Sequence, residues 1–118
     1  MSVEHHNNVT FFRFIQEYGK HGIALWGLTT QNEPVDGNIY RFPFQAMGWT
    51  PEMQRDFVKL DLGPALHNNS LQHIALMIMD DQRLMLPHWA KIVSFGDACI
   101  CIIYTCRMVC KVIWREKM

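Results

Sequence analysis

The chain has 118 residues, of which 49% are hydrophobic, and its eleven Lys and Arg balance its eleven Asp and Glu. This apolar content argues against wholesale disorder, and a net charge of zero gives no basic footprint for nucleic acid and no polybasic membrane patch. One domain fits this length, whereas a complete (β/α)8 barrel of roughly 250 residues does not.

A helix is predicted near the N-terminus, because apolar residues recur there at helical spacing, at Phe11, Phe14, Ile15 and Tyr18. Asn8 or Thr10 can cap the start of this helix, and the segment 19–22, with a glycine at each end, can terminate it. Residues 1–10 carry no apolar core behind a basic start, so we expect an N-terminal extension there and no signal peptide.

Two unbroken apolar runs, at 23–28 and 74–79, each predict a strand that is covered on both faces, as in a parallel sheet. The first run ends in a polar segment that contains Asn32 and Glu33. The second run ends in Asp80, Asp81 and Gln82. In parallel α/β folds the carboxyl ends of the strands carry the active site, so these polar residues should converge on one rim.

A long loop and a helix connect the two runs. The loop, at 35–49, is rich in aromatic residues, which argues for a functional loop rather than a disordered one. Thr50 as N-cap and Pro51 at the first helical position predict the start of the helix. The apolar face of this helix is assigned to Met53, Phe57 and Leu60, and the Gly-Pro pair at 63–64 should end or kink it.

Glu33 is the best candidate for general acid/base chemistry, since burial against aromatic rings raises the pKa of a carboxyl group toward neutrality. Asn32 offers an amide to orient a substrate hydroxyl, and the rings of Phe42 and Phe44 offer flat faces for sugars or lipid chains. The alternative is that Asn32 and Glu33 only shape the turn before Pro34.

The pair Asp80-Asp81 allows a metal site, paired carboxylates, or a polar strand end held by Arg83, and the last is favoured. No residue pattern calls for a cofactor, and we expect neither a cofactor nor a metal.

All four cysteines fall within residues 94–118, at Cys99, Cys101, Cys106 and Cys110, in a spacing that matches no familiar zinc site. The segment 98–114 is mostly apolar but too short and too charged for a typical membrane span. A disulfide framework or a small membrane anchor stays open here. The composition predicts a divergent tail that does not belong to the same structural unit.

Ordered blocks between Phe11 and Val93 resemble the glucosylceramidases of glycoside hydrolase family 30, the lysosomal acid β-glucosidases. The blocks are WGLTTQNEP at 26–34, FPFQ at 42–45, TPE at 50–52, QRDF at 54–57, DLGP at 61–64, DDQRL at 80–84 and LPHWAK at 86–91. The resemblance implies an α/β fold, a partial (β/α)8 TIM barrel around its fourth and fifth strands, at residues 11–93. Residues 1–10 and 94–118 then become an extension and a non-homologous tail.

By this resemblance Glu33 is the acid/base and Asn32 contacts the sugar beside the reacting centre. Phe42, at a position typically Tyr, and Phe44 border the active-site entrance, and Gln82 lies near the pocket. The resemblance further implies hydrolysis of the β-glucosidic bond of glucosylceramide with retention of configuration.

The resemblance also implies a setting for the chain. The family acts in the lysosome, at membrane surfaces, with an activator protein and acidic lipids, and not on nucleic acid. The sequon at Asn68 falls where these enzymes carry a glycan.

One departure from the family limits this expectation. Retaining hydrolysis needs a second carboxyl group as nucleophile, which the family carries on a later strand. None of the glutamates matches that motif; they are Glu4, Glu17, Glu33, Glu52 and Glu116. We therefore expect a piece of a glycosidase that is inactive alone. The alternative is a non-catalytic glycolipid-binding or regulatory protein derived from the enzyme.

Overall fold

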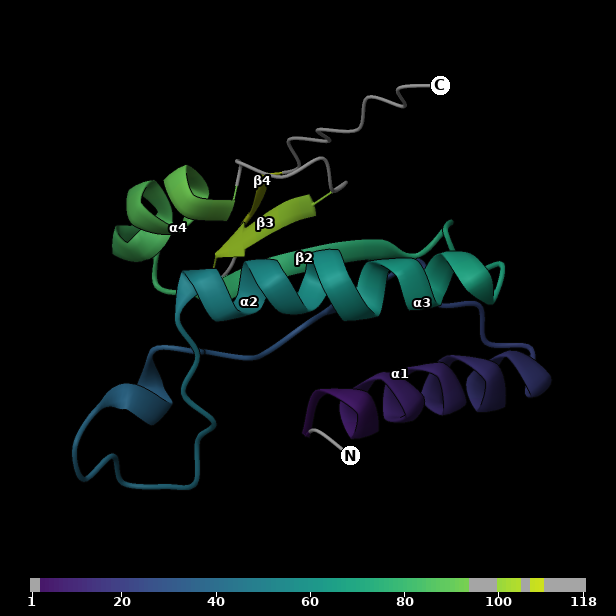
Figure 1. Cartoon of the computed structure of the whole chain (residues 1–118), viewed down its shortest axis with the longest axis horizontal. Coiled ribbons are helices and arrows are strands. Elements are labelled where there is room, and N and C mark those ends of the chain that lie inside the picture. Colours follow the sequence, from purple (N-terminus) through teal and green to yellow (C-terminus); the bar gives the residue numbers. More distant parts are fainter. Residues whose placement is uncertain (1–2, 94–99, 105–106, 110–118) are drawn as a thin grey trace.

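A computed structural model describes residues 3–93, 100–104 and 107–109, and the side chains of residues 10–93 (Figure 1). Its helices are α1 (Val3–Lys20), α2 (Pro51–Phe57), α3 (Gly63–Asn68) and α4 (Leu86–Val93). Its strands are β1 (Gly27–Thr29), β2 (Ala75–Asp81), β3 (Ile100–Tyr104) and β4 (Arg107–Val109). Short 3-10 helices at Asp36–Asn38 and Arg83–Met85 and a π-helical turn at Val58–Leu62 complete the described elements.

The strands form one sheet in the order β1-β2-β3-β4, in which β2 is parallel to both β1 and β3, and β4 runs antiparallel to β3. Helices lie on the crossovers between the parallel strands, which confirms the predicted α/β arrangement. The strand at 100–104 lies in the predicted tail, yet it joins the sheet beside β2. The expectation that the whole tail stands apart from the sheet is therefore wrong for this strand.

Helix α1 starts earlier than predicted. It begins at Val3, so Asn8 and Thr10 lie within the helix and do not cap it. The physical reason is that no Pro or Gly interrupts the segment before Gly19. The predicted end is confirmed, because the amide of Ile23 donates to the carbonyl of Tyr18 and Gly22 has a φ of 76°. This left-handed glycine ends the helix in a Schellman motif.

Strand β1 is shorter than the predicted strand at 23–28, and it lies at the edge of the sheet. Ile23 and Trp26 lie before β1 and are 49% and 59% exposed, where coverage on both faces was expected. Gly27 permits its close approach to β2. A Cβ there would lie 2.9 Å from the methyl carbon of Met77 and 3.0 Å from the carbonyl oxygen of Ala75.

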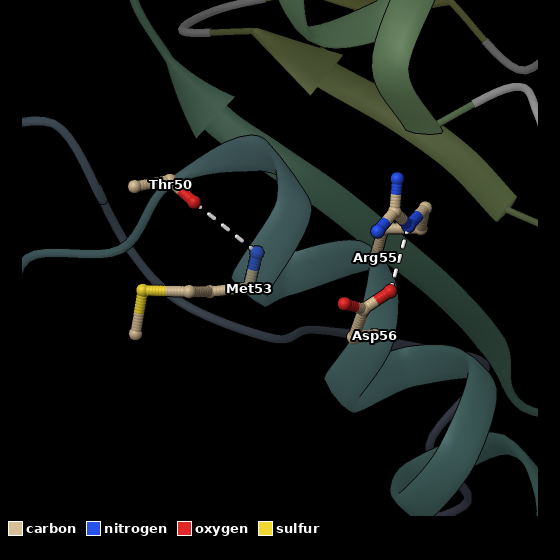
Figure 2. Close-up of polar contacts among 4 residues, drawn as sticks. All are labelled: Thr50, Met53, Arg55 and Asp56. Carbon is tan, nitrogen blue, oxygen red and sulfur yellow. Dashed lines mark hydrogen bonds and ion pairs between the residues drawn. The ribbon is translucent and has the colours of Figure 1, made fainter.

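The crossover from α2 to α3 begins as predicted. The Thr50 hydroxyl accepts a hydrogen bond from the amide of Met53 over 3.2 Å, and Pro51 takes the first helical position (Figure 2). The Gly-Pro pair does not end the helix. A π-turn precedes it instead, and the helical path continues into α3, which Figure 1 shows lying along β2. A Cβ at residue 63 would lie 2.7 Å from the carbonyl oxygen of Val58, so glycine suits this turn.

The apolar face predicted for this crossover is only partly correct. Phe57 is buried, but Met53 is 53% exposed and Leu60 is 68% exposed. The π-turn shifts the helical phase, so Val58 and Leu62 face the core instead. The core cluster then joins the sheet to its helices, and its buried members are Ile15, Trp49, Phe57, Val58, Leu62, Leu66, Ile74, Leu76, Ile78, Met79, Trp89 and Val93.

Among the helices of the described residues, none combines the length and the apolar character that crossing a membrane requires. The predictions made for the tail, its cysteine chemistry and the apolar stretch at 98–114, fall on side chains outside the described part of the chain.

Candidate active site

The carboxyl ends of β1 and β2 meet, as the polar residues after each strand predicted. The amide of Thr30 donates to the carbonyl of Met77 over 3.1 Å, and the amide of Glu33 donates to the carbonyl of Asp80 over 3.0 Å. The structure therefore brings Glu33 beside the segment that runs from Asp80 to Gln82.

The backbone is strained where the two strands end. The register between β2 and β3 shifts between Met79 and Asp81, which marks a β-bulge. Met79 and Asp80 have φ values of 73° and 46°, and Glu33 has a φ of 41°. Left-handed conformations are costly for residues other than glycine, and they tend to cluster at functional sites.

Asp81 holds this rim together from inside. Its side chain is 1% exposed, and its two carboxylate oxygens accept hydrogen bonds from the amide of Val35 over 3.1 Å and from the amide of Gln82 over 2.6 Å. The first bond ties the chain just after Glu33 to the end of β2, and the second is a local bond between neighbouring residues. Whether Asp80 and Asp81 also pair with Arg83 stays a prediction.

Glu33 is partly exposed and stands among other carboxylates. The negative charge of Asp36 is the largest cause that raises the pKa of Glu33 above its ordinary value. Partial burial, a hydrogen bond with Asp36 and the charges of Asp81 and Asp80 act in the same direction. A carboxyl group that keeps its proton to higher pH is suited to donating that proton to a leaving oxygen.

Gln54 is a site residue that sequence reasoning missed. Its side chain is fully buried, and its Oε1 accepts hydrogen bonds from the amide of Met79 over 3.0 Å and from Nε1 of Trp89 over 2.7 Å. Its Nε2 donates to Oγ1 of Thr30 over 2.8 Å. Helical spacing could have found it, because Gln54 lies three residues before the core residue Phe57 and so shares its face.

The long loop after Glu33 is fastened at its base. The amide of Trp49 donates to the carbonyl of Pro34 over 2.9 Å, and Nδ2 of Asn38 donates to the carbonyl of Trp49 over 3.0 Å. Where the two arms of the loop cross, a Cβ on Gly37 would lie 2.0 Å from the amide nitrogen of Gly48. Both glycines are therefore needed for the arms to pass each other.

The aromatic residues lie further out on this loop, which Figure 1 shows extending away from the sheet between β1 and α2. Phe42 and Phe44 pack edge to face, with ring centroids 4.6 Å apart, and Phe44 is 64% exposed. The guanidinium of Arg41 lies 5.2 Å from the ring centroid of Tyr40. The structure thus pairs Phe42 with Phe44 on this loop.

The remaining predicted residues divide between two ends of the sheet. Asn32 and Gln82 are exposed at the carboxyl ends of the strands, beside Glu33 and Asp81. Asn68 is exposed in the last turn of α3, which leads into the amino end of β2. Within the described ranges, no group of three or more His, Cys, Asp or Glu side chains could hold a metal ion.

Comparisons with known proteins assign the chain to a family. The sequence model of the glycosyl hydrolase family 30 TIM-barrel domain matches residues 2–102, a range that crosses both boundaries predicted for the central unit. The chain is 49% identical over 83 residues to lysosomal acid glucosylceramidase of Mus musculus, and 48% identical over 91 residues to putative glucosylceramidase 2 of Caenorhabditis elegans. These matches cover 70% and 75% of this chain, but only 16% and 18% of the relatives.

Solved structures agree with this fold. The chain superposes on SrfJ from Salmonella typhimurium with a TM-score of 0.70 at 20% identity, over 82% of this chain and 22% of that one. It superposes on the endo-β1,6-glucanase BT3312 with a TM-score of 0.65 at 25% identity, over 79% of this chain and 21% of that one. The described residues therefore form part of a TIM barrel, and the chain belongs to glycosyl hydrolase family 30.

Proposed function

We propose that this chain supplies the acid/base side of a retaining β-glucosidase site, with glucosylceramide as the substrate and Glu33 as the proton donor. The observation that carries the proposal is the position of Glu33. Its amide is bonded to the carbonyl of Asp80 at the carboxyl ends of two parallel strands, and the neighbouring carboxylates raise its pKa. The carboxyl ends of barrel strands are where active sites of this fold lie.

The chemistry follows from that protonation state. The Glu33 carboxyl group protonates the glycosidic oxygen as the bond to the sugar breaks, and its carboxylate then accepts a proton from the water that releases the sugar. Asn32 and Gln82, both exposed at this rim, hydrogen-bond sugar hydroxyls. Phe42 and Phe44 border the entrance and contact the lipid part of the substrate.

We further propose that the 118 residues alone do not complete this reaction. A retaining site needs a nucleophilic carboxylate roughly 5–5.5 Å from the acid/base. Glu17 and Glu52 lie on helices α1 and α2, and no other glutamate of the chain matches the family motif for the nucleophile. In this proposal residues 11–93 are the catalytic segment, 1–10 an extension, and 94–118 a tail that diverges in sequence although its strand β3 joins the sheet.

The cellular setting is part of the same proposal. The mouse relative is named as a lysosomal enzyme, which supports a lysosomal location, and hydrolysis of glucosylceramide would belong to sphingolipid metabolism. An activator protein and acidic lipids would assist access to the substrate. Asn68, exposed in the sequon 68–70, would carry a glycan on a chain that enters the secretory pathway.

A chimera tests the acid/base role directly. Residues 11–93 replace the matching segment of the mouse relative, and hydrolysis of glucosylceramide and of an aryl β-glucoside is measured. We expect turnover in the chimera and a loss of about 10²–10⁴-fold in Glu33→Gln, since that is the usual contribution of general acid/base catalysis. The matched control is Glu52→Gln, an exposed glutamate on α2, which should leave turnover unchanged. Full activity in Glu33→Gln would remove Glu33 from the proposal.

The isolated 118-residue chain tests the second proposal, that the chain alone does not complete the reaction. We expect it to hydrolyse neither substrate, and turnover that disappears in Glu33→Gln would show that the chain is complete enough to act. Binding of a glucoside without turnover, measured by titration, would favour the non-catalytic glycolipid-binding alternative. Exposed rings at Tyr40 and Phe44, 86% and 64% accessible, are the observation behind that alternative.

A further inference from the structure

We propose that Gln54 is a positioning residue for Glu33: its buried amide fixes the left-handed turn at Met79 and Asp80, and this turn holds the backbone of Glu33. The catalytic meaning of this inference rests on the acid/base role proposed above. The positional claim itself concerns only the described residues, and it can be tested without turnover.

The first step is the amide of Met79. At the bulge of β2 this residue has a φ of 73°, and its side chain is fully buried. A buried backbone amide requires a hydrogen-bond partner, because leaving it unpaired is costly. Oε1 of Gln54, 3.0 Å away, is that partner. Met79 can therefore keep its left-handed conformation because the side chain of Gln54, on α2, accepts the hydrogen bond of its amide.

The second step runs from the turn to Glu33. Asp80 follows with a φ of 46°, and its carbonyl accepts the hydrogen bond from the amide of Glu33. Glu33 is itself left-handed, with a φ of 41°. Each of these conformations is unfavourable alone, so the direction of the Asp80 carbonyl depends on the contact that fixes Met79.

The third step is that Gln54 also holds the strand that leads to Glu33. Its Nε2 donates to Oγ1 of Thr30, three residues before Glu33, and Thr30 is 4% exposed. Its Oε1 also accepts from Nε1 of Trp89, a buried residue of α4. One side chain therefore joins the end of β1, the turn after β2 and the following helix, and every polar atom of its amide group is engaged.

The electrostatic consequence is measurable. The turn brings the carboxylates of Asp80 and Asp81 close to Glu33, and together with Asp36 these groups raise the pKa of the Glu33 carboxyl. If the turn relaxes, the separation from Asp80 and Asp81 changes while Asp36, on the same loop as Glu33, stays close. A partial fall in the pKa of Glu33 is therefore the expected sign of a lost turn.

The test uses the 118-residue chain. In Gln54→Leu, which keeps the size but loses all three hydrogen bonds, we expect hydrogen exchange at the Glu33 amide to accelerate by about tenfold beyond any global change. The pKa of the Glu33 carboxyl, followed by ¹³C NMR, should fall toward its ordinary value. In Gln54→Glu a buried acid stays neutral and keeps the acceptor for Met79, so both readouts should remain close to those of the parent chain.

The matched control is Leu66→Ala, which removes core volume in α3, away from the strand ends. It should change exchange across the chain without singling out Glu33. Should Gln54→Leu fail to fold, Thr30→Val removes one bond of the network, and we expect the same direction with a smaller effect. If Gln54→Leu and Leu66→Ala change hydrogen exchange at the Glu33 amide to the same extent, the proposal is overturned. If Gln54→Leu does not fold, unchanged exchange at the Glu33 amide in Thr30→Val overturns it.

The two proposals fail separately. Loss of turnover in the Glu33→Gln chimera, with no special exchange at Glu33 in Gln54→Leu, would leave the acid/base role and remove the role of Gln54. Fast exchange at Glu33 in Gln54→Leu, with full turnover in the Glu33→Gln chimera, would leave the positioning and remove the catalysis.

Discussion

The two apolar runs of this chain both begin Ile-Ala-Leu, at 23–25 and at 74–76, yet they have different fates. The second becomes the seven-residue strand β2, which pairs on both sides and buries Leu76, Ile78 and Met79. The first yields only the three-residue β1, with neighbours on one side and an exposed Trp26. Composition predicts the tendency to form a strand, whereas the pairing and packing around each run decide how much of it is buried.

The largest expected effect comes from a core substitution in the second run. Ile78→Ala empties a fully buried site in β2 and should lower the free energy of unfolding by about 2–5 kcal/mol. Ile23→Ala, the matched change in a residue that is 49% exposed, should cost well below half as much. Urea denaturation of both variants is the measurement. Equal losses would mean that the first run is covered in solution.

A second change sharpens the contact between the two strands. Gly27→Ala places a methyl group 3.0 Å from the carbonyl oxygen of Ala75 and 2.9 Å from the Met77 methyl, so overpacking should cost about 1–3 kcal/mol. Gly19→Ala, in α1 with nothing within 4 Å, is the control and should be neutral or stabilising. Thermal unfolding of both variants tests this prediction. An unchanged stability in Gly27→Ala would show that β1 can shift along β2.

A third change concerns the helix that connects the strands. Thr50→Ala removes the hydroxyl that caps α2 and should lower the free energy of unfolding by about 1 kcal/mol, while Thr50→Ser retains the cap (Figure 2). Chemical denaturation of the three proteins tests this. The ion pair between Arg55 and Asp56, shown in the same view, is partly exposed and should contribute much less.

The smallest expected effect on stability lies where the two strands end. Because the pKa of Glu33 is raised above 4.5 on folding, the folded chain holds this proton more tightly than the unfolded chain. The contribution of Glu33 to stability should therefore be greatest at low pH and decline as the pH rises from 4.5 through the folded pKa. In Asp36→Asn the pKa of Glu33 should fall, because its largest cause is removed, and NMR titration checks this. No fall would show that Asp36 does not face Glu33.

Much of this fold was predictable from particular residues. The apolar runs located β2 almost completely, Thr50 and Pro51 located the start of α2, and Gly22 located the end of α1. The polar residues after each run predicted that Glu33 and Asp80 would lie at one rim, and their hydrogen bond agrees. These features were visible because each depends on a local rule of spacing, capping or strand direction.

Other features were not predictable because they depend on contacts between distant segments. Helical spacing places Gln54 on the same face as Phe57, but its hydrogen bonds to Thr30, Met79 and Trp89 have no sign in the local sequence. The π-turn that exposes Leu60 and buries Val58 has no local pattern that reveals it. The outward path of the aromatic loop was likewise not evident from its composition (Figure 1).

The sequence by itself determined the family, the alternation of strands and helices, and the choice of Glu33 as the candidate acid/base, because these depend on motifs and short-range spacing. Only the tertiary structure decided the extent of burial at β1, the left-handed turn at Met79 and Asp80, and the joining of both strand ends by Gln54. Those outcomes depend on which backbone groups find partners across the sheet, and partners far apart in the chain are set by packing, not by local sequence.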